Sequence, residues 1–153
     1  MIQSYIETPP ITLASNTSPI AFTRDCIRTR SCSNCSGWLC HNEGSPLYKI
    51  LNGGRYRVTF NANVSSATAG TVALGLFMDG VLAPGTTVIA EVATAGDYYN
   101  VSFDKIIPLC CNADTTITVG SVPSVLTGAT VPAPTDTEIP IIQNANLTIT
   151  RLA

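Results

Sequence analysis

The chain has 153 residues, a formal net charge of −2, and 12% charged against 45% hydrophobic residues. This length suits a single domain with a full hydrophobic core, and the low charge excludes an intrinsically disordered chain and a generic nucleic-acid-binding protein. Because a soluble monomer normally exposes more charge, we expect a partner to cover part of the apolar surface.

The sequence carries neither a membrane-spanning segment nor a secretion signal. No stretch approaches the roughly 20 consecutive apolar residues that a membrane helix needs, so no membrane partner is expected. Residues 1–10 have neither the basic start nor the apolar core of a secretory signal peptide. We therefore expect a protein that works in the cytosol or leaves the cell by another route, such as lysis or particle assembly.

The predicted elements are short β-strands. Segments rich in Thr, Val, Ile and Ala alternate with Gly and Pro, and no run shows helical periodicity, which predicts an all-β sandwich or barrel of seven to nine strands. Residues 1–17 are expected to form an N-terminal arm or edge strand before a domain over 18–153. Residues 11–14 and 19–22 could add edge strands.

The clearest predicted strand covers residues 55–64. Polar and apolar side chains alternate there over ten residues, a period of two that is typical of a strand with one buried face. Gly53-Gly54 precedes the strand as a turn. The side chains predicted to point inward are Tyr56, Val58, Phe60, Ala62 and Val64.

Residues 71–78 form the next predicted strand, which is apolar on both faces. One layer of a sandwich covers one face, so we expect a sister copy of the chain to cover the other. Asp79-Gly80 then predicts a tight hairpin to residues 81–83, which end at a turn at Pro84-Gly85.

Residues 86–94 and 98–107 are predicted to pair with each other, and residues 115–122 and 146–152 complete the set of strands. Residues 123–140, rich in Pro and Thr, are predicted to form a long surface loop, a kind of segment that tends to be functional or to lie at interfaces. The side chains predicted to form the core or a trimer interface are Tyr56, Val58, Phe60, Leu74, Leu76, Phe77, Tyr99, Val101, Phe103, Leu147 and Ile149.

Four cysteines and the single histidine gather within residues 26–41. Zinc prefers such ligands, although only one Cys-x2-Cys pair is present and the other spacings are irregular. An iron–sulfur cluster fits less well. Disulfides or reduced buried thiols are the alternatives, and six cysteines allow 15 pairings that the sequence does not choose between. The candidates are Cys26, Cys32, Cys35, Cys40, Cys110 and Cys111 for disulfides or metal, with Cys32, Cys35, Cys40 and His41 as the zinc set.

No arrangement of residues predicts catalysis. His41 directly follows Cys40, and the side chains of adjacent residues diverge, so these two do not form a nucleophile–base dyad. The carboxylates form no recognisable acid–base pair, and Gly53-Gly54 lacks the lysine and helix of a phosphate-binding loop. We therefore predict that the protein is not an enzyme and, zinc apart, has no cofactor.

The basic residues are concentrated in one part of the chain. They indicate either a basic face that meets an acidic partner surface or ordinary solvated charge. Six of the eight lie within residues 24–57: Arg24, Arg28, Arg30, Lys49, Arg55 and Arg57.

Several stretches together resemble the tumour-necrosis-factor-like jelly roll, the fold of complement globular heads. Residues 54–60 are similar to that family's Gly-x-Tyr-x-Val-x-Phe strand, and residues 74–86 to its hairpin of two apolar strands around Asp-Gly. Residues 145–153 resemble the last strand of bacterial and phage members, such as the globular tip of collagen-like spore-surface proteins. Residues 18–22 match the opening strand in kind, so the resemblance spans positions 18–153.

The resemblance implies a jelly-roll β-sandwich of about 8–10 antiparallel strands, assembled as a homotrimer around an apolar axis, whose usual work is adhesion, display or receptor binding. The chain departs from the family in its Cys-rich insertion at 26–41, its Thr/Pro loop at 123–140 and the lack of a collagen-like Gly-X-Y stalk.

The resulting functional prediction is a non-enzymatic structural or display protein. We expect a homotrimer on a phage virion, as a capsid decoration or head fibre, or on a bacterial surface, with a capsid or surface-layer protein as its further partner. The expected location is therefore a virion or an extracellular surface. The alternatives are an adhesion module that binds a receptor or a glycan, and a small zinc- or iron–sulfur-binding domain centred on residues 26–41.

Overall fold

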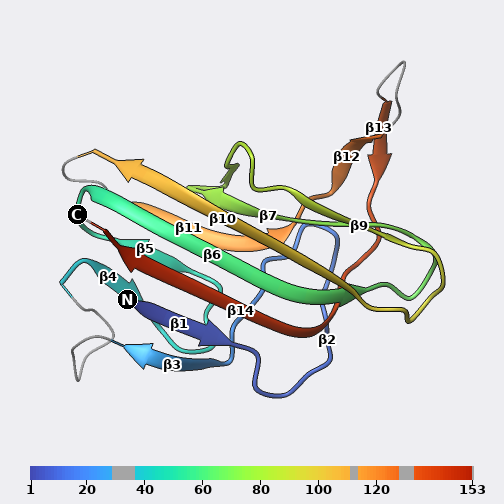
Figure 1. Ribbon diagram of the computed structural model, residues 1–153, viewed down its shortest axis with the longest axis horizontal. Helices are drawn as coiled ribbons and strands as arrows, with labels where there is room; N and C mark the ends of the chain where they lie inside the picture. Colours follow the sequence, from blue (N-terminus) through green and yellow to red (C-terminus); the bar gives the residue numbers. More distant parts are fainter. Residues whose placement is uncertain (29–36, 111–113, 128–132, 153) are drawn as a thin grey trace.

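The chain folds into a sandwich of two antiparallel β-sheets, as the computed structural model shows for residues 1–28, 37–110, 114–127 and 133–152 (Figure 1). These ranges contain no helix, hence none long and apolar enough to cross a membrane. The predicted all-β jelly roll is confirmed. The strands are β1 (Ile2–Tyr5), β2 (Ile11–Thr12), β3 (Arg24–Arg28), β4 (Leu39–His41), β5 (Tyr48–Ile50), β6 (Gly54–Ser65), β7 (Gly70–Met78), β8 (Val81–Leu82), β9 (Val88–Val92), β10 (Tyr99–Leu109), β11 (Thr115–Ser121), β12 (Ser124–Thr127), β13 (Ala133–Asp136) and β14 (Ile141–Arg151).

The first sheet, called sheet 1 below, has the strand order β10-β6-β14-β1-β3, and β2 pairs with the start of β14. The long strands β10, β6 and β14 lie next to one another in it (Figure 1). Their alternating pattern turns apolar side chains toward the second sheet and polar ones outward, as predicted for residues 55–64. Residues 1–17 contribute β1, which pairs on both sides and is therefore an inner strand.

The second sheet, called sheet 2 below, has the order β4-β5-β11-β7-β8, and β9 also pairs with β7. The predicted hairpin after β7 is present. Asp79 and Gly80 both have positive φ, 50° and 80°, which is the geometry of a type I′ turn.

The prediction that residues 86–94 pair with residues 98–107 is wrong. β9 pairs with β7 in sheet 2, whereas β10 pairs with β6 in sheet 1. The chain between β9 and β10 therefore crosses from one sheet to the other. Alternation along the chain locates a strand, but the strand's partner depends on contacts between distant segments, which alternation does not report.

The core lies between the two sheets and contains most of the predicted residues. Tyr99 is only partly buried against this core. The predicted residues that are buried in it are Tyr56, Val58, Phe60, Leu74, Leu76, Val101, Phe103, Leu147 and Ile149.

Part of the outward face of β7 is covered by the chain itself. Ala73 is fully buried there and packs with Val122 and Val125 in a small second cluster, against which Phe77 and Leu82 lie. The prediction that β7 is apolar on both faces is confirmed. Cover of this second face by a sister copy stays a prediction, although Ala73 does not require it, because residues that follow β11 cover Ala73.

Residues 123–140, predicted to be a surface loop, contain β12 and β13, which pair only with each other and rise away from the sandwich (Figure 1). The base of this hairpin is fixed to sheet 2. Thr137 Oγ1 donates a hydrogen bond of 2.6 Å to the carbonyl oxygen of Val122, and Glu138 N donates one of 2.8 Å to that of Thr71.

Candidate functional site

The structure describes three of the six cysteines. Cys26 on β3 and Cys110 after β10 are exposed free thiols, and Cys40 on β4 takes part in a disulfide. Cys32, Cys35 and Cys111 lie outside the described residues, so the partner of Cys40 stays open among the pairings that the sequence allows. The predicted zinc set of Cys32, Cys35, Cys40 and His41 conflicts with this disulfide, because zinc binds cysteine as a thiolate. Within the described ranges, no three His, Cys, Asp or Glu side chains cluster as metal ligands.

His41 is buried between the sheets and takes part in a polar network. Its ring stacks on that of Tyr48, with the centroids 3.8 Å apart, and its Nδ1 lies 2.9 Å from the carbonyl oxygen of Leu47. Its Nε2 lies 3.3 Å from Oδ1 of Asp25, which also accepts a 2.6 Å hydrogen bond from the hydroxyl of Ser4. Because Asp25 belongs to sheet 1 and His41 to sheet 2, this network connects the two layers.

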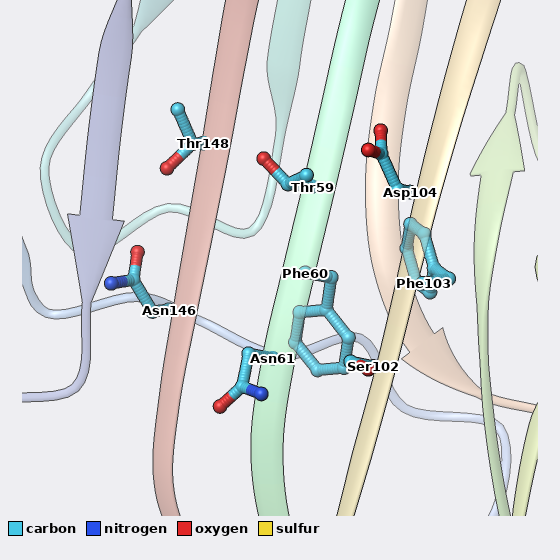
Figure 2. A pocket seen from close by; sticks show the side chains of 8 residues that line it. All are labelled: Thr59, Phe60, Asn61, Ser102, Phe103, Asp104, Asn146 and Thr148. Atoms are coloured by element: carbon cyan, nitrogen blue, oxygen red, sulfur yellow. The ribbon is translucent and has the colours of Figure 1, made fainter.

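The outward face of sheet 1 carries a hollow of about 510 Å³ across β14, β6 and β10 (Figure 2). Strand register arranges its polar side chains in two rows, because Asn61 pairs with both Asn146 and Ser102, and Thr59 pairs with both Thr148 and Asp104. We call these six residues the polar grid: Asn146, Asn61 and Ser102 in one row, and Thr148, Thr59 and Asp104 in the other.

The hollow has an aromatic layer beneath it. Phe60 and Phe103 belong to its lining, yet only 1% and 8% of their surfaces are exposed. Their rings pack in the core with centroids 5.3 Å apart. These two residues therefore support the strands under the polar grid and leave its outer surface to hydroxyl, amide and carboxyl groups.

Asp104 supplies the one charged side chain of the polar grid, and Arg57 in the next row neutralises it. Nε of Arg57 lies 3.0 Å from each carboxylate oxygen of Asp104, and Nη2 also contacts Oδ2. These hydrogen bonds lower the pKa of Asp104 and raise that of Arg57. Asp104 is thus held as an ion-paired carboxylate, which is unsuited to proton transfer near neutral pH.

Other basic residues of the 24–57 segment also find partners within the chain. Arg24 lies 3.0 Å from Glu7 and 3.2 Å from Glu43, and Lys49 lies 3.0 Å from Asp114. The hypothesis of a basic face directed at an acidic partner therefore loses three of its six cations, including Arg57, to internal pairs.

The sequence predicted only part of this site. The alternation along residues 55–64 predicts that Thr59 and Asn61 point outward. Strand pairing then places them beside four residues that lie about 40 to 90 positions away in the chain: Ser102, Asp104, Asn146 and Thr148. No local signal reports such pairing. The described candidates among the cysteines and histidine, which are Cys26, Cys40, His41 and Cys110, do not line the hollow.

Comparison with known proteins gives the fold and no family. No family model matches the chain, and no curated protein is similar to it in sequence. Among solved structures, the globular domain of zebrafish complement 1qA protein matches 99% of this chain and 96% of its own, with a TM-score of 0.59 and 11% identity. A family 35 carbohydrate-binding module from Clostridium thermocellum matches 92% of this chain and 98% of its own, with a TM-score of 0.35 and 7% identity.

Proposed function

We propose that this protein is a non-enzymatic display or binding domain that acts as a homotrimer on a virion or an extracellular surface. The observation that carries the proposal is the agreement of the fold, over nearly the whole chain, with a complement globular domain. Because a fold alone does not fix a function, the proposal also rests on the site, where the polar grid offers binding groups and no nucleophile–base pair.

The surface of sheet 1 offers a place for a sister copy. Ile106 and Leu152 have 54% and 48% of their surfaces exposed. They flank the start of β6, since Ile106 pairs with Arg57, and the backbone nitrogen of Leu152 donates to the carbonyl oxygen of Arg55. Large apolar side chains exposed on either side of one strand favour cover by a partner.

The trimer is tested by light scattering after size exclusion and by native mass spectrometry of the full chain. We expect three times the chain mass, and we expect Ile106→Asp to shift the population toward monomer, because it buries a charge at the proposed contact. Val81→Asp is the matched control, since Val81 is 70% exposed on sheet 2. A chain that stays monomeric across the accessible concentrations contradicts the proposal.

The virion or surface setting is tested separately. An antibody against the full chain should label intact particles or the cell exterior in electron microscopy. Label confined to the cell interior would contradict this part of the proposal. A second candidate function, an adhesion module that binds a glycan or a receptor, is favoured by the hollow on sheet 1.

A further inference from the structure

The polar grid is a regular array of hydrogen-bonding groups on an exposed sheet face. Neighbouring strands lie about 4.7–4.9 Å apart and alternate side chains point the same way. The three side chains of each row, from β14, β6 and β10, therefore stand side by side at nearly constant spacing. Figure 2 shows them spread across the three strands.

Much of the hydrogen-bonding capacity of the polar grid is unused within the chain. The hydroxyl groups of Thr59, Thr148 and Ser102 make no hydrogen bond to other described residues. Asn146 accepts from Gln3 Nε2 at 3.3 Å through its Oδ1, which leaves its amide nitrogen available. Asn61 makes two contacts with Asn100, both at the long distance of 3.4 Å. Donors and acceptors are thus available side by side.

The charges that line the hollow indicate which class of ligand it can bind. Asp104 is ion-paired with Arg57, and no cation stands in the polar grid to attract a phosphate or sulfate group. The exposed groups of the polar grid are hydroxyls, amides and one carboxylate, so an apolar peptide would find no complementary contact there. An uncharged ligand with many hydroxyl groups matches this lining.

A second copy of the chain is a poorer occupant of the hollow. Self-association interfaces concentrate apolar side chains at their centre, whereas two facing copies of the polar grid would remove six polar side chains each from water. Each of these groups would then need a new hydrogen-bonding partner to offset its desolvation. A flexible sugar chain meets this requirement more easily, because bridging water fills the remaining gaps.

We infer that the polar grid binds a segment of an uncharged oligosaccharide. The hydroxyl and amide groups of the polar grid would form hydrogen bonds with the hydroxyl groups of the sugar. The inference rests on the binding role proposed above and specifies its ligand and its location. Each hydrogen bond to the sugar replaces one to water, so each contributes little net binding free energy and a single site binds weakly. Three copies in one assembly would raise the avidity on a repeating glycan.

The test uses the full chain labelled with 15N and a panel of uncharged linear hexasaccharides: cello-, laminari-, malto- and xylohexaose. The side-chain amide signals of Asn61 and Asn146 report on the hollow directly in heteronuclear NMR spectra. At roughly 1 mM sugar we expect at least one probe to shift these signals in a saturable way. We expect the double variant Thr59→Val/Thr148→Val to weaken that binding by about tenfold or more, because it removes two hydroxyls and keeps the β-branched shape.

Thr116→Val is the matched control, since it makes the same change on β11 of sheet 2 and should leave binding unchanged. If no probe shifts the Asn61 and Asn146 signals, or if the double variant binds as tightly as the unaltered chain, the inference is overturned. It is also overturned if these signals shift with protein concentration in Ile106→Asp, the variant expected to be monomeric, because a second copy then occupies the hollow itself. The homotrimer itself is judged by the mass measurement, so the two proposals can fail independently.

Discussion

His41 contributes to the contact between the two sheets, and both nitrogens of its ring have partners. The carbonyl oxygen of Leu47 can only accept, so Nδ1 of His41 carries the hydrogen. Its Nε2 faces an oxygen of Asp25 at 3.3 Å. This contact joins β4 of sheet 2 to β3 of sheet 1.

Arg57 sets the acidity of Asp104, and its removal should be measurable. The hydrogen bond from Arg57 holds the pKa of Asp104 below its ordinary value of 3.8. Since the folded-state pKa is lowered, the ion pair stabilises the fold above the unfolded-state pKa, and this stabilisation is lost as the pH falls through the folded-state pKa. We expect Arg57→Gln to return the Asp104 pKa toward its ordinary value, as followed by NMR titration of the carboxyl carbon.

Lys49→Gln is the control for this prediction, because Lys49 pairs with Asp114 instead. Equal titration curves for Asp104 in the unaltered chain and in Arg57→Gln would contradict it. At this scale the sequence could predict that Arg57 and Thr59 face outward, since alternation suffices for that. It could not bring Ser4, Asp25 and His41 together, because they come from three strands in two sheets.

At the scale of elements, one glycine fixes how the segment before β3 packs on sheet 2. Ser18 and Ile20 exchange backbone hydrogen bonds with Ser121 and Val119, which places Pro19 against Gly120. A Cβ on Gly120 would lie 2.9 Å from the Cα of Pro19 and 3.0 Å from the carbonyl oxygen of Ser18. Both contacts are with backbone, which cannot move aside without breaking these hydrogen bonds.

We therefore expect Gly120→Ala to lower the free energy of unfolding by about 1–3 kcal/mol, measured by chemical denaturation, and to speed hydrogen exchange at the amides of Ile20 and Ser121. Gly70→Ala is the control. Its Cβ would meet the side chain of Glu138 and no backbone atom among its nearest contacts, so the cost should be smaller and limited to moving that side chain and losing its hydrogen bond from Thr68. Equal effects of the two substitutions would contradict this account.

The strands were predictable to different degrees, for physical reasons. β6, β7 and β14 bury apolar residues in regular patterns that the sequence displays directly. The sequence did not predict β13 because it contains Pro134, and proline lacks the backbone donor that an inner strand needs. It is tolerated here because β13 pairs with β12 alone, opposite Leu126. The partners of β9 and β10 could not be predicted, since they depend on the crossing between sheets.

At the scale of the whole molecule, the projecting hairpin is separable from the sandwich. Replacing residues 126–134 by Asn-Gly would close a two-residue turn between the paired residues Val125 and Thr135. We expect the free energy of unfolding to change by less than about 1 kcal/mol, because Val125 and the Thr137 anchor are kept. Chemical denaturation measures this free energy, and light scattering measures whether the variant still assembles. Loss of assembly in this variant would show that the hairpin belongs to the interface between copies.

The pairing of β1 with β14 has a consequence for the synthesis of this chain. Ile2 lies opposite Ile149, so β1 finds this neighbour only after all the strands between them have been made. Until β14 emerges from the ribosome, its place between β6 and β1 stays open, and β1 can pair only with β3. Sheet 1 therefore cannot be completed before β14 is synthesised, and until then its unpaired strand edges are open to pairing with other chains.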